Sequence, residues 1–168
     1  MMLEGSIGPV DRILRSLVIL LILGSATPLD ASTAVQAQEG PAGGPATALV
    51  VFGTEEEADT IWAEVARTED ERAKGLMFRE ELGENAGMLF VLPEYQEISL
   101  WMKDTYIPLD VAFMDPTFRV TGIRSMEPES QRLVSSPGRV QFALEVNQGW
   151  FEEHGVRADD RARVVFGN

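Results

Sequence analysis

The sequence predicts a strand-rich α+β fold, a small rolled sheet or barrel of about eight short strands with two short helices. Three observations lead to this fold class. Short runs rich in β-branched and aromatic residues recur along the chain, with turn residues between them. Only one stretch, within 69–77, places apolar residues at helical spacing. Strands do not alternate regularly with long helices, so a doubly wound parallel sheet is not expected.

Eight runs account for the predicted strands. The run 87–92 is continuously apolar and ends at Pro93, whereas 60–66 has its apolar residues on one face and 98–103 alternates. The run 140–146 also alternates apolar with polar or small residues, which predicts a strand with one face buried and the other in water. The predicted strands are 47–52, 60–66, 87–92, 98–103, 109–114, 118–123, 140–146 and 163–166.

Two short helices are predicted between these strands. Thr68 is followed three residues later by Glu71, a capping-box pattern that predicts a helix over 69–77. A second helix is predicted over 148–154, where a glycine follows as the expected C-terminal residue. The segment 126–138 is rich in proline and serine and predicts a long loop.

The first residues have the pattern of a secretory signal peptide. Arg12 and Arg15 precede a short apolar run at 17–23, and small residues follow it. Cleavage is expected after Ala37, with Ala26 as a second candidate. The apolar run is too short to cross a bilayer as a helix, which needs about 20 residues. We therefore expect an exported protein, periplasmic or extracellular, with no stable membrane span after cleavage.

The rest of the chain predicts one domain after a linker. Residues 1–37 are assigned to the signal peptide and residues 38–46, rich in Gly, Pro and Ala, to a flexible linker. Residues 47–168 then form a single domain, which is long enough to bury one hydrophobic core.

The composition excludes several functional classes. The chain of 168 residues has 27 acidic and 14 basic residues, a net charge of -13, which disfavours binding to nucleic acid. Cysteine is absent and His154 is the single histidine, so disulfides, thiolate metal sites and a Ser-His-Asp triad are not expected. Phosphate-loop and dinucleotide-binding glycine patterns are also missing. The sequence therefore predicts neither a metal site nor a cofactor.

Several segments together resemble one known family. They are GLMFR at 75–79, GMLFV at 87–91, WMKDTYIPLD at 101–110, and a C-terminal pattern that includes Leu144, Glu145, Gly149, Gly155, Val156 and Asp160. The chain resembles the bacterial and archaeal family called domain of unknown function 192, over about 63–165. Asp104 stands where the family commonly has Asn, and Phe118 stands where a turn glycine is usual. The resemblance implies a fold and frequent export, but no chemistry.

The segment 101–110 is the first candidate site. Pro108 fixes its own backbone angle and biases the preceding residue toward extended geometry, so the segment is stiff. Asp104 and Thr105 could act as a turn cap by accepting hydrogen bonds from backbone N–H groups. The same stiffness suits a structural corner or a binding loop, and both interpretations stay open.

Charged residues in and near this segment extend the candidate site. Asp110 enters an apolar strand, and if it is buried it needs a partner, for which Lys103 and Arg79 are the candidates by charge. Arg79 could recognise a carboxylate or phosphate, or it could form an ion pair with Glu80, Glu84 or a strand carboxylate.

Two more side chains complete the candidate ligand- or partner-binding set. Trp101 could stack on a sugar or on a partner surface, or the first helix could cover it. Glu145 falls on the polar face of its strand and is expected to be solvated. The full set is Arg79, Trp101, Lys103, Asp104, Thr105, Asp110 and Glu145.

Three functions are compatible with these residues. The first is an exported non-catalytic module that binds a small ligand or a partner protein through the 101–110 loop. The second is an enzyme that uses two carboxylates, from Asp104, Asp110 or Glu145, in acid–base chemistry on an envelope or extracellular substrate. The third is a purely structural envelope protein. The absence of a recognisable catalytic constellation favours the first.

Overall fold

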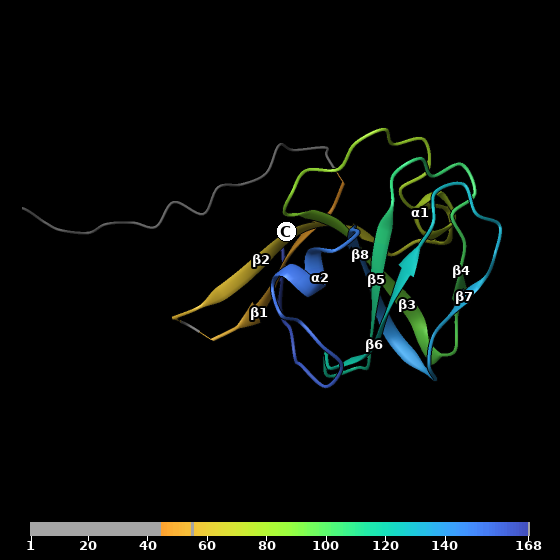
Figure 1. Cartoon of the computed structure of the whole chain (residues 1–168). Coiled ribbons are helices and arrows are strands. Elements are labelled where there is room, and N and C mark those ends of the chain that lie inside the picture. Colours follow the sequence, from red (N-terminus) through yellow and green to blue (C-terminus); the bar gives the residue numbers. More distant parts are fainter. Residues whose placement is uncertain (1–44, 55, 168) are drawn as a thin grey trace, which may run out of the picture. The chain divides into compact units, whose positions relative to one another are not determined.

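The computed structural model describes residues 45–54 and 56–167. The predicted signal peptide and all but the end of the predicted linker lie outside the described residues. Nine strands and two helices make up this part of the chain (Figure 1). The strands are β1 (Thr47–Gly53), β2 (Ala58–Ala66), β3 (Ala86–Gln96), β4 (Ser99–Leu100), β5 (Leu109–Met114), β6 (Val120–Met126), β7 (Val134–Ser135), β8 (Val140–Asn147) and β9 (Arg163–Phe166).

Seven of these strands form one sheet in the order β6-β5-β8-β3-β2-β1-β9. All neighbours pair antiparallel except β2 and β3, which are parallel. A parallel pair needs a crossover, and here the crossover contains α1 (Glu69–Lys74). The strand-rich α+β prediction is confirmed, but the barrel alternative is wrong, because β6 and β9 lie at opposite ends of the sheet.

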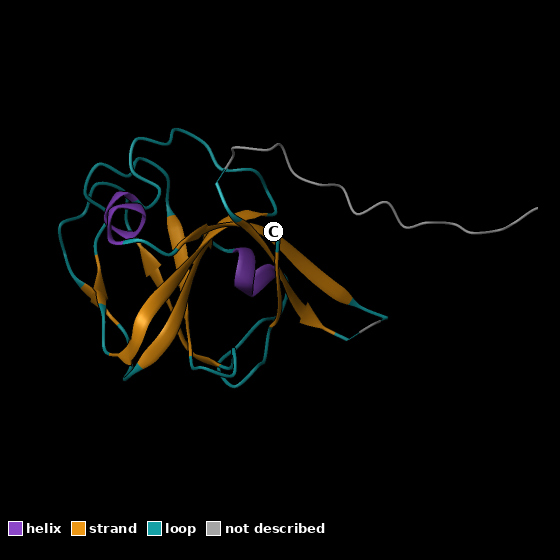
Figure 2. Cartoon of the chain, turned by 180° about the vertical axis from the view of Figure 1, so that it is seen from behind, coloured by secondary structure: helices purple, strands orange, loops and turns teal. Residues whose placement is uncertain are grey.

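The helices are shorter than predicted, and they lie well apart from each other (Figure 2). The predicted capping box is present, since Thr68 accepts from the Glu71 N–H and the Glu71 carboxylate accepts from the Thr68 N–H. The helix α1 nevertheless ends at Lys74, because Gly75 turns the chain with a positive φ of 49°. The second helix, α2, covers only Trp150–Glu153.

Two predicted elements differ from the structure. The expected strand 98–103 is reduced to the two-residue strand β4, which pairs with β7 outside the main sheet. The strand β7 itself lies within 126–138, which was predicted to be a loop. A two-residue strand is too short to show an alternation of apolar and polar residues in the sequence. Its position is set by the strand with which it pairs.

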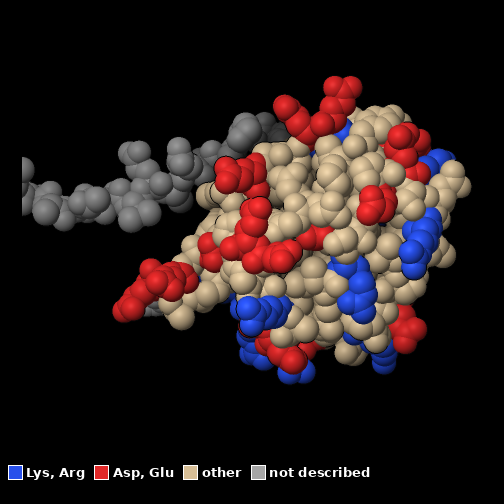
Figure 3. Space-filling model, in the orientation of Figure 1, with Lys and Arg blue, Asp and Glu red and all other residues tan. Residues whose placement is uncertain are grey.

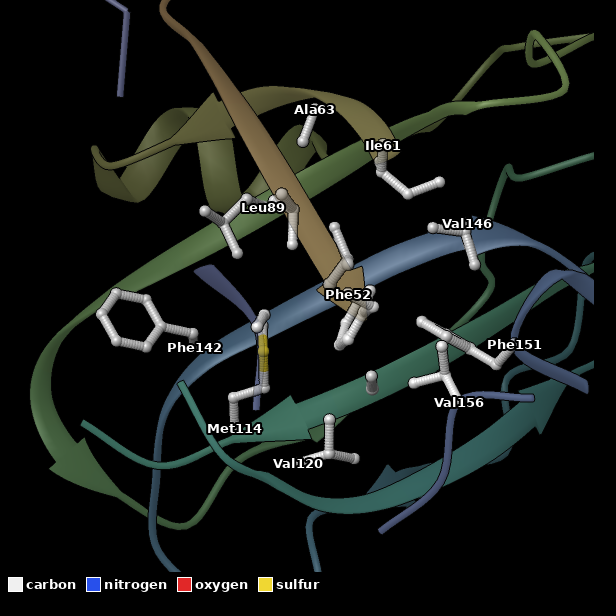
Figure 4. Packing of buried hydrophobic residues seen from close by; sticks show 14 of the residues in the cluster. Phe52, Ile61, Ala63, Leu89, Met114, Val120, Phe142, Val146, Phe151 and Val156 are labelled. Carbon is white, nitrogen blue, oxygen red and sulfur yellow. The ribbon is translucent and has the colours of Figure 1, made fainter. Parts of the chain in front are cut away.

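The main sheet is covered on both faces by apolar side chains. On one face Phe52, Ile61, Leu89 and Val146 converge with Phe151 of α2 (Figure 4). On the other face the buried cluster includes Leu76, Met88, Phe90, Met102, Val111, Phe113 and Met126. The strand β8 lies between β3 and β5, so both of its faces are buried. The prediction that one face of 140–146 is exposed to water is therefore wrong.

None of the helices in the described part of the chain is both long enough and apolar enough to span a membrane.

Candidate functional site

The segment that follows β4 forms a tight turn held by backbone hydrogen bonds. The Thr105 N–H donates to the Met102 carbonyl at 3.1 Å, and the Phe78 N–H donates to the Asp104 carbonyl at 2.7 Å. Asp104 has a positive φ of 55°, a conformation that Asp and Asn tolerate better than most residues. The exchange of the usual Asn for Asp104 therefore keeps the backbone geometry of the motif.

The predicted side-chain caps of this turn are not found. The Thr105 hydroxyl donates to the Lys103 carbonyl at 3.4 Å, instead of accepting from a backbone N–H. No described group forms a hydrogen bond with the Asp104 carboxylate. The turn is stabilised by its backbone, so the Thr105 side chain, although only 4% exposed, remains available to a neighbouring cavity.

That cavity lies between the end of α1 and the turn and has a volume of about 140 Å³. Its lining residues come from α1 and the chain after it, from β3 and β8, and from the segment that follows β3. They are Arg72, Ala73, Lys74, Gly75, Leu76, Met77, Phe90, Ser99, Leu100, Trp101, Thr105 and Glu145. We call this hollow the Glu145 pocket. It brings together three of the predicted site residues: Trp101, Thr105 and Glu145.

Glu145 is the unusual group of this pocket. It is 5% exposed and lies on β8 directly between Met88 of β3 and Val111 of β5. No described protein group donates a hydrogen bond or forms an ion pair with its carboxyl. Burial in these apolar surroundings raises the pKa of Glu145 to about 8. The expectation that Glu145 is solvated is wrong, because β8 is central and this face of the sheet is covered.

Trp101 forms part of the pocket wall and remains 48% exposed. The ammonium group of Lys103 lies 5.7 Å from the centre of the indole ring, within cation–π range. Helix α1 therefore does not cover Trp101, which leaves its ring available for stacking. Lys103 does not itself line the pocket, but its ammonium group lies over the ring of Trp101, which does.

Arg79 lies apart from the pocket, in an ion pair. Its guanidinium donates to the Glu64 carboxylate of β2 at 2.6 Å. This agrees with the predicted alternative of a strand carboxylate, and neither Glu80 nor Glu84 is its partner. Arg79 is consequently held to the sheet by a partly exposed salt bridge.

Asp110 points to the opposite face of the sheet from Glu145. It pairs in register with Val146, whereas its neighbour Val111 pairs with Glu145, and successive strand residues face opposite ways. One carboxylate oxygen accepts from the Gly149 N–H at 2.8 Å, and the other is buried without a partner. Pairing of Asp110 with Lys103 or Arg79 is therefore wrong, since the group is bound to the start of α2.

The separation of these carboxylates contradicts a two-carboxylate active site. Asp110 and Glu145 lie on different faces of the sheet, and Asp104 does not line the Glu145 pocket. The pocket also contains residues that sequence reasoning missed, notably Arg72, Lys74 and Phe90. The motif at 75–79 offered a signal, because its first three residues line the pocket.

Two other hollows contain no comparable group. A cavity of about 260 Å³ lies beside β6 and β7, with Arg124 and Arg132 in its lining. Another, of about 310 Å³, contains His154, whose Nε2 lies 3.8 Å from the Asp59 carboxylate. The described residues contain no group of three His, Cys, Asp or Glu side chains suited to hold a metal ion. Among the described residues that line these two cavities, none is a buried ionisable side chain without a partner.

Charges are unevenly distributed on the face shown in Figure 3. Acidic side chains gather toward β1 and β2, and basic side chains form separate groups toward β6 and the nearby loops. No continuous basic stripe follows this face, which agrees with the net charge of -13.

Two solved structures resemble this chain closely in fold. A protein of unknown function from Novosphingobium aromaticivorans DSM 12444 is 31% identical, with a TM-score of 0.69, over 83% of this chain and 99% of that one. A candidate transcription regulator from Sinorhizobium meliloti 1021 is 28% identical, with a TM-score of 0.67, over 71% of this chain and 93% of that one.

No curated protein matches the chain at a significant level. A family model does match: the one named DUF192 and described as "Uncharacterized ACR" covers residues 50–164, which is most of the chain. The chain therefore belongs to the domain of unknown function 192 family.

Proposed function

We propose that this protein is an exported, non-catalytic module that binds a small molecule in the Glu145 pocket. The observation that carries the proposal is the Glu145 carboxyl, which is buried, faces the pocket and has no partner among the described residues. Trp101 and Thr105 add a flat surface and a hydroxyl beside it. The proposal places the ligand against the start of the 101–110 loop.

The energetic cost of Glu145 supports a functional role. Burial disfavours the charged form of the Glu145 carboxyl, and an apolar side chain between Met88 and Val111 would avoid that cost. Strongly perturbed ionisable groups in clefts are enriched at functional sites. A ligand that supplies the missing hydrogen bonds would recover the lost free energy on binding.

Binding explains the pocket better than catalysis does. A carboxylate enzyme of the predicted type needs two carboxyl groups, and Glu145 is the only acidic residue among the described ones that lines the pocket. Within the part of the chain that the structure describes, neither a histidine nor a second carboxylate lines the pocket to exchange protons with Glu145. The purely structural alternative accounts for Asp110, which holds the start of α2, but leaves the unpartnered Glu145 without a role.

Export and the class of partner rest on the sequence. The basic and apolar pattern at 12–26 supports export, and intact mass spectrometry of the exported fraction would test it. We expect a mature chain that begins at Gln38.

The description of the Sinorhizobium meliloti relative does not lead us to propose nucleic-acid binding, because the net charge of -13 opposes it.

A fragment screen followed by protein-detected NMR tests the binding function. We expect hits that shift the amide signals of Gly75 and Thr105, which both line the pocket. Trp101→Ala should weaken these hits, and Trp62→Ala is the matched control, because Trp62 is exposed but lies outside the pocket. If no fragment shifts the pocket signals, and Glu145→Leu only stabilises the protein, the structural alternative replaces this proposal.

A further inference from the structure

We propose that the Glu145 pocket recognises an uncharged planar ligand that presents a hydrogen-bond acceptor and a donor side by side, as a primary amide or a lactam does. The ligand is bound while Glu145 keeps its proton. This inference rests on the proposed function and names its ligand class.

The first step is the electrostatic environment of Glu145. On the two neighbouring strands it faces Met88, Phe90 and Val111, which carry no charge. From the turn it faces Thr105, which is neutral. Of the described cationic side chains, those that line the pocket, Arg72 and Lys74, both come from α1.

Those two cations do not neutralise the carboxyl. The guanidinium of Arg72 donates to the backbone carbonyls of Arg67 and Val91, and the ammonium of Lys74 forms no ion pair with Glu145. Desolvation is consequently the single cause of the raised pKa, about 8, so the group is mostly protonated near neutral pH.

The second step is the shape of a protonated carboxyl. Such a group has one O–H donor next to one carbonyl acceptor. Both oxygens of Glu145 lack protein partners among the described residues, so this pair of sites is free toward the pocket. The complementary ligand edge has an acceptor and a donor in the reverse order, which amides and lactams provide.

The third step is the wall beside Glu145. Trp101 is half exposed and lines the same pocket, and Lys103 lies near its ring. A flat ligand can stack on the indole while its polar edge meets the carboxyl. The pocket therefore combines a stacking surface with a donor–acceptor pair.

Charged ligands have a different consequence for the proton. A cation would stabilise the ionised carboxylate and expel the proton, so its affinity would rise with pH. An anion would be drawn to the α1 cations and would lose the hydrogen bond from Glu145 when the proton leaves. The pH dependence and the proton count therefore distinguish a cation from the other two classes, and the relative affinities of neutral and anionic probes distinguish those two.

Three probes of nearly equal shape test the inference: benzamide, benzoate and benzamidine, which are neutral, anionic and cationic. Affinities are measured by protein-detected NMR from about pH 6 to about pH 9.5, a range that brackets the pKa of Glu145. We expect benzamide to bind tightest near neutral pH, without proton release, and to lose about tenfold in affinity per pH unit above that pKa.

The variant Glu145→Gln makes the test specific. Glutamine keeps an adjacent acceptor and donor but cannot ionise, so benzamide should still bind, with an affinity that no longer changes with pH. Glu152→Gln is the control, because Glu152 is exposed and lies on α2, away from the pocket. In this control the pH dependence should equal that of the wild type.

Several results would overturn the inference. These are tighter binding of benzamidine than of benzamide at neutral pH, a preference for benzoate, benzamide binding that does not depend on pH, or no binding of any probe. The fragment screen described above judges the proposed function separately. If every hit of that screen is charged, the proposed binding function stands, but the uncharged ligand class is rejected.

Discussion

Glu145 of β8 lies directly opposite Val111 of β5, so its side chain lies on the covered, largely apolar face of the sheet, where it lines the Glu145 pocket. The preceding residue of β5, Asp110, lies opposite Val146 and faces the other side of the sheet. Two buried carboxyl groups on adjacent strands therefore have different surroundings. One accepts a hydrogen bond from the start of α2, and the other opens onto a pocket without a protein partner.

The free energy of unfolding should fall as the pH rises from about 4.5 to about 8, because of Glu145. Its pKa is raised from 4.5 to about 8, so the folded state holds a proton that the unfolded chain has already lost. The contribution of Glu145 to the free energy of unfolding is fully present below about pH 4.5 and is lost as the pH rises through about 8, with a magnitude on the order of 5 kcal/mol at most. Urea denaturation at several pH values measures this slope.

The variant Glu145→Gln should remove most of that slope. We expect it to be more stable than the wild type above about pH 8 and close to it at about pH 5, because glutamine stays neutral. Glu152→Gln is again the control. Equal slopes for the wild type and Glu145→Gln would show that the carboxyl is solvated after all.

Asp110→Ala should destabilise the domain. The substitution leaves the Gly149 N–H without its acceptor, which costs about 1–3 kcal/mol when the group is shielded from water. Binding in the Glu145 pocket should not change, because Asp110 faces the other side of the sheet. Chemical denaturation and fragment titration of the same sample check both parts, and a weaker fragment affinity at unchanged stability would contradict this assignment.

The Arg79–Glu64 ion pair should contribute little to stability. Both side chains are about one-third exposed, and such pairs are typically worth about 0–1 kcal/mol. A double-mutant cycle with Arg79→Ala and Glu64→Ala measures the coupling, which should decrease as salt is added. A coupling well above 1 kcal/mol that resists salt would mean that the pair is more strongly desolvated than its exposure indicates.

Substitutions at Asp104 should follow backbone preference. Asp104→Asn is expected to change the free energy of unfolding by less than about 0.5 kcal/mol, because Asn also accepts a positive φ. Asp104→Val should cost about 1–2 kcal/mol or more, since a β-branched residue is strained there. Thermal unfolding of the two variants compares them directly, and equal losses would assign the effect to the carboxylate instead.

Local signals in the sequence were sufficient for much of this fold. Turn residues and apolar runs marked most strands, and the capping box from Thr68 to Glu71 fixed the start of α1. The motif at 101–110 also indicated a stiff turn, which the backbone hydrogen bonds of Thr105 and Asp104 form. These features depend on residues close together in the chain, so the sequence alone specifies them.

The sequence by itself determined the family, the strand-rich class and three side chains of the pocket, because motifs and hydrophobic periods are local. Only the tertiary structure decided where Glu145 lies. Its strand alternates polar and apolar residues, a pattern that predicts one wet face, yet β3, β5 and the covering segments bury both faces. Burial and pKa depend on neighbours brought together from distant parts of the chain, and that information is absent from any single segment.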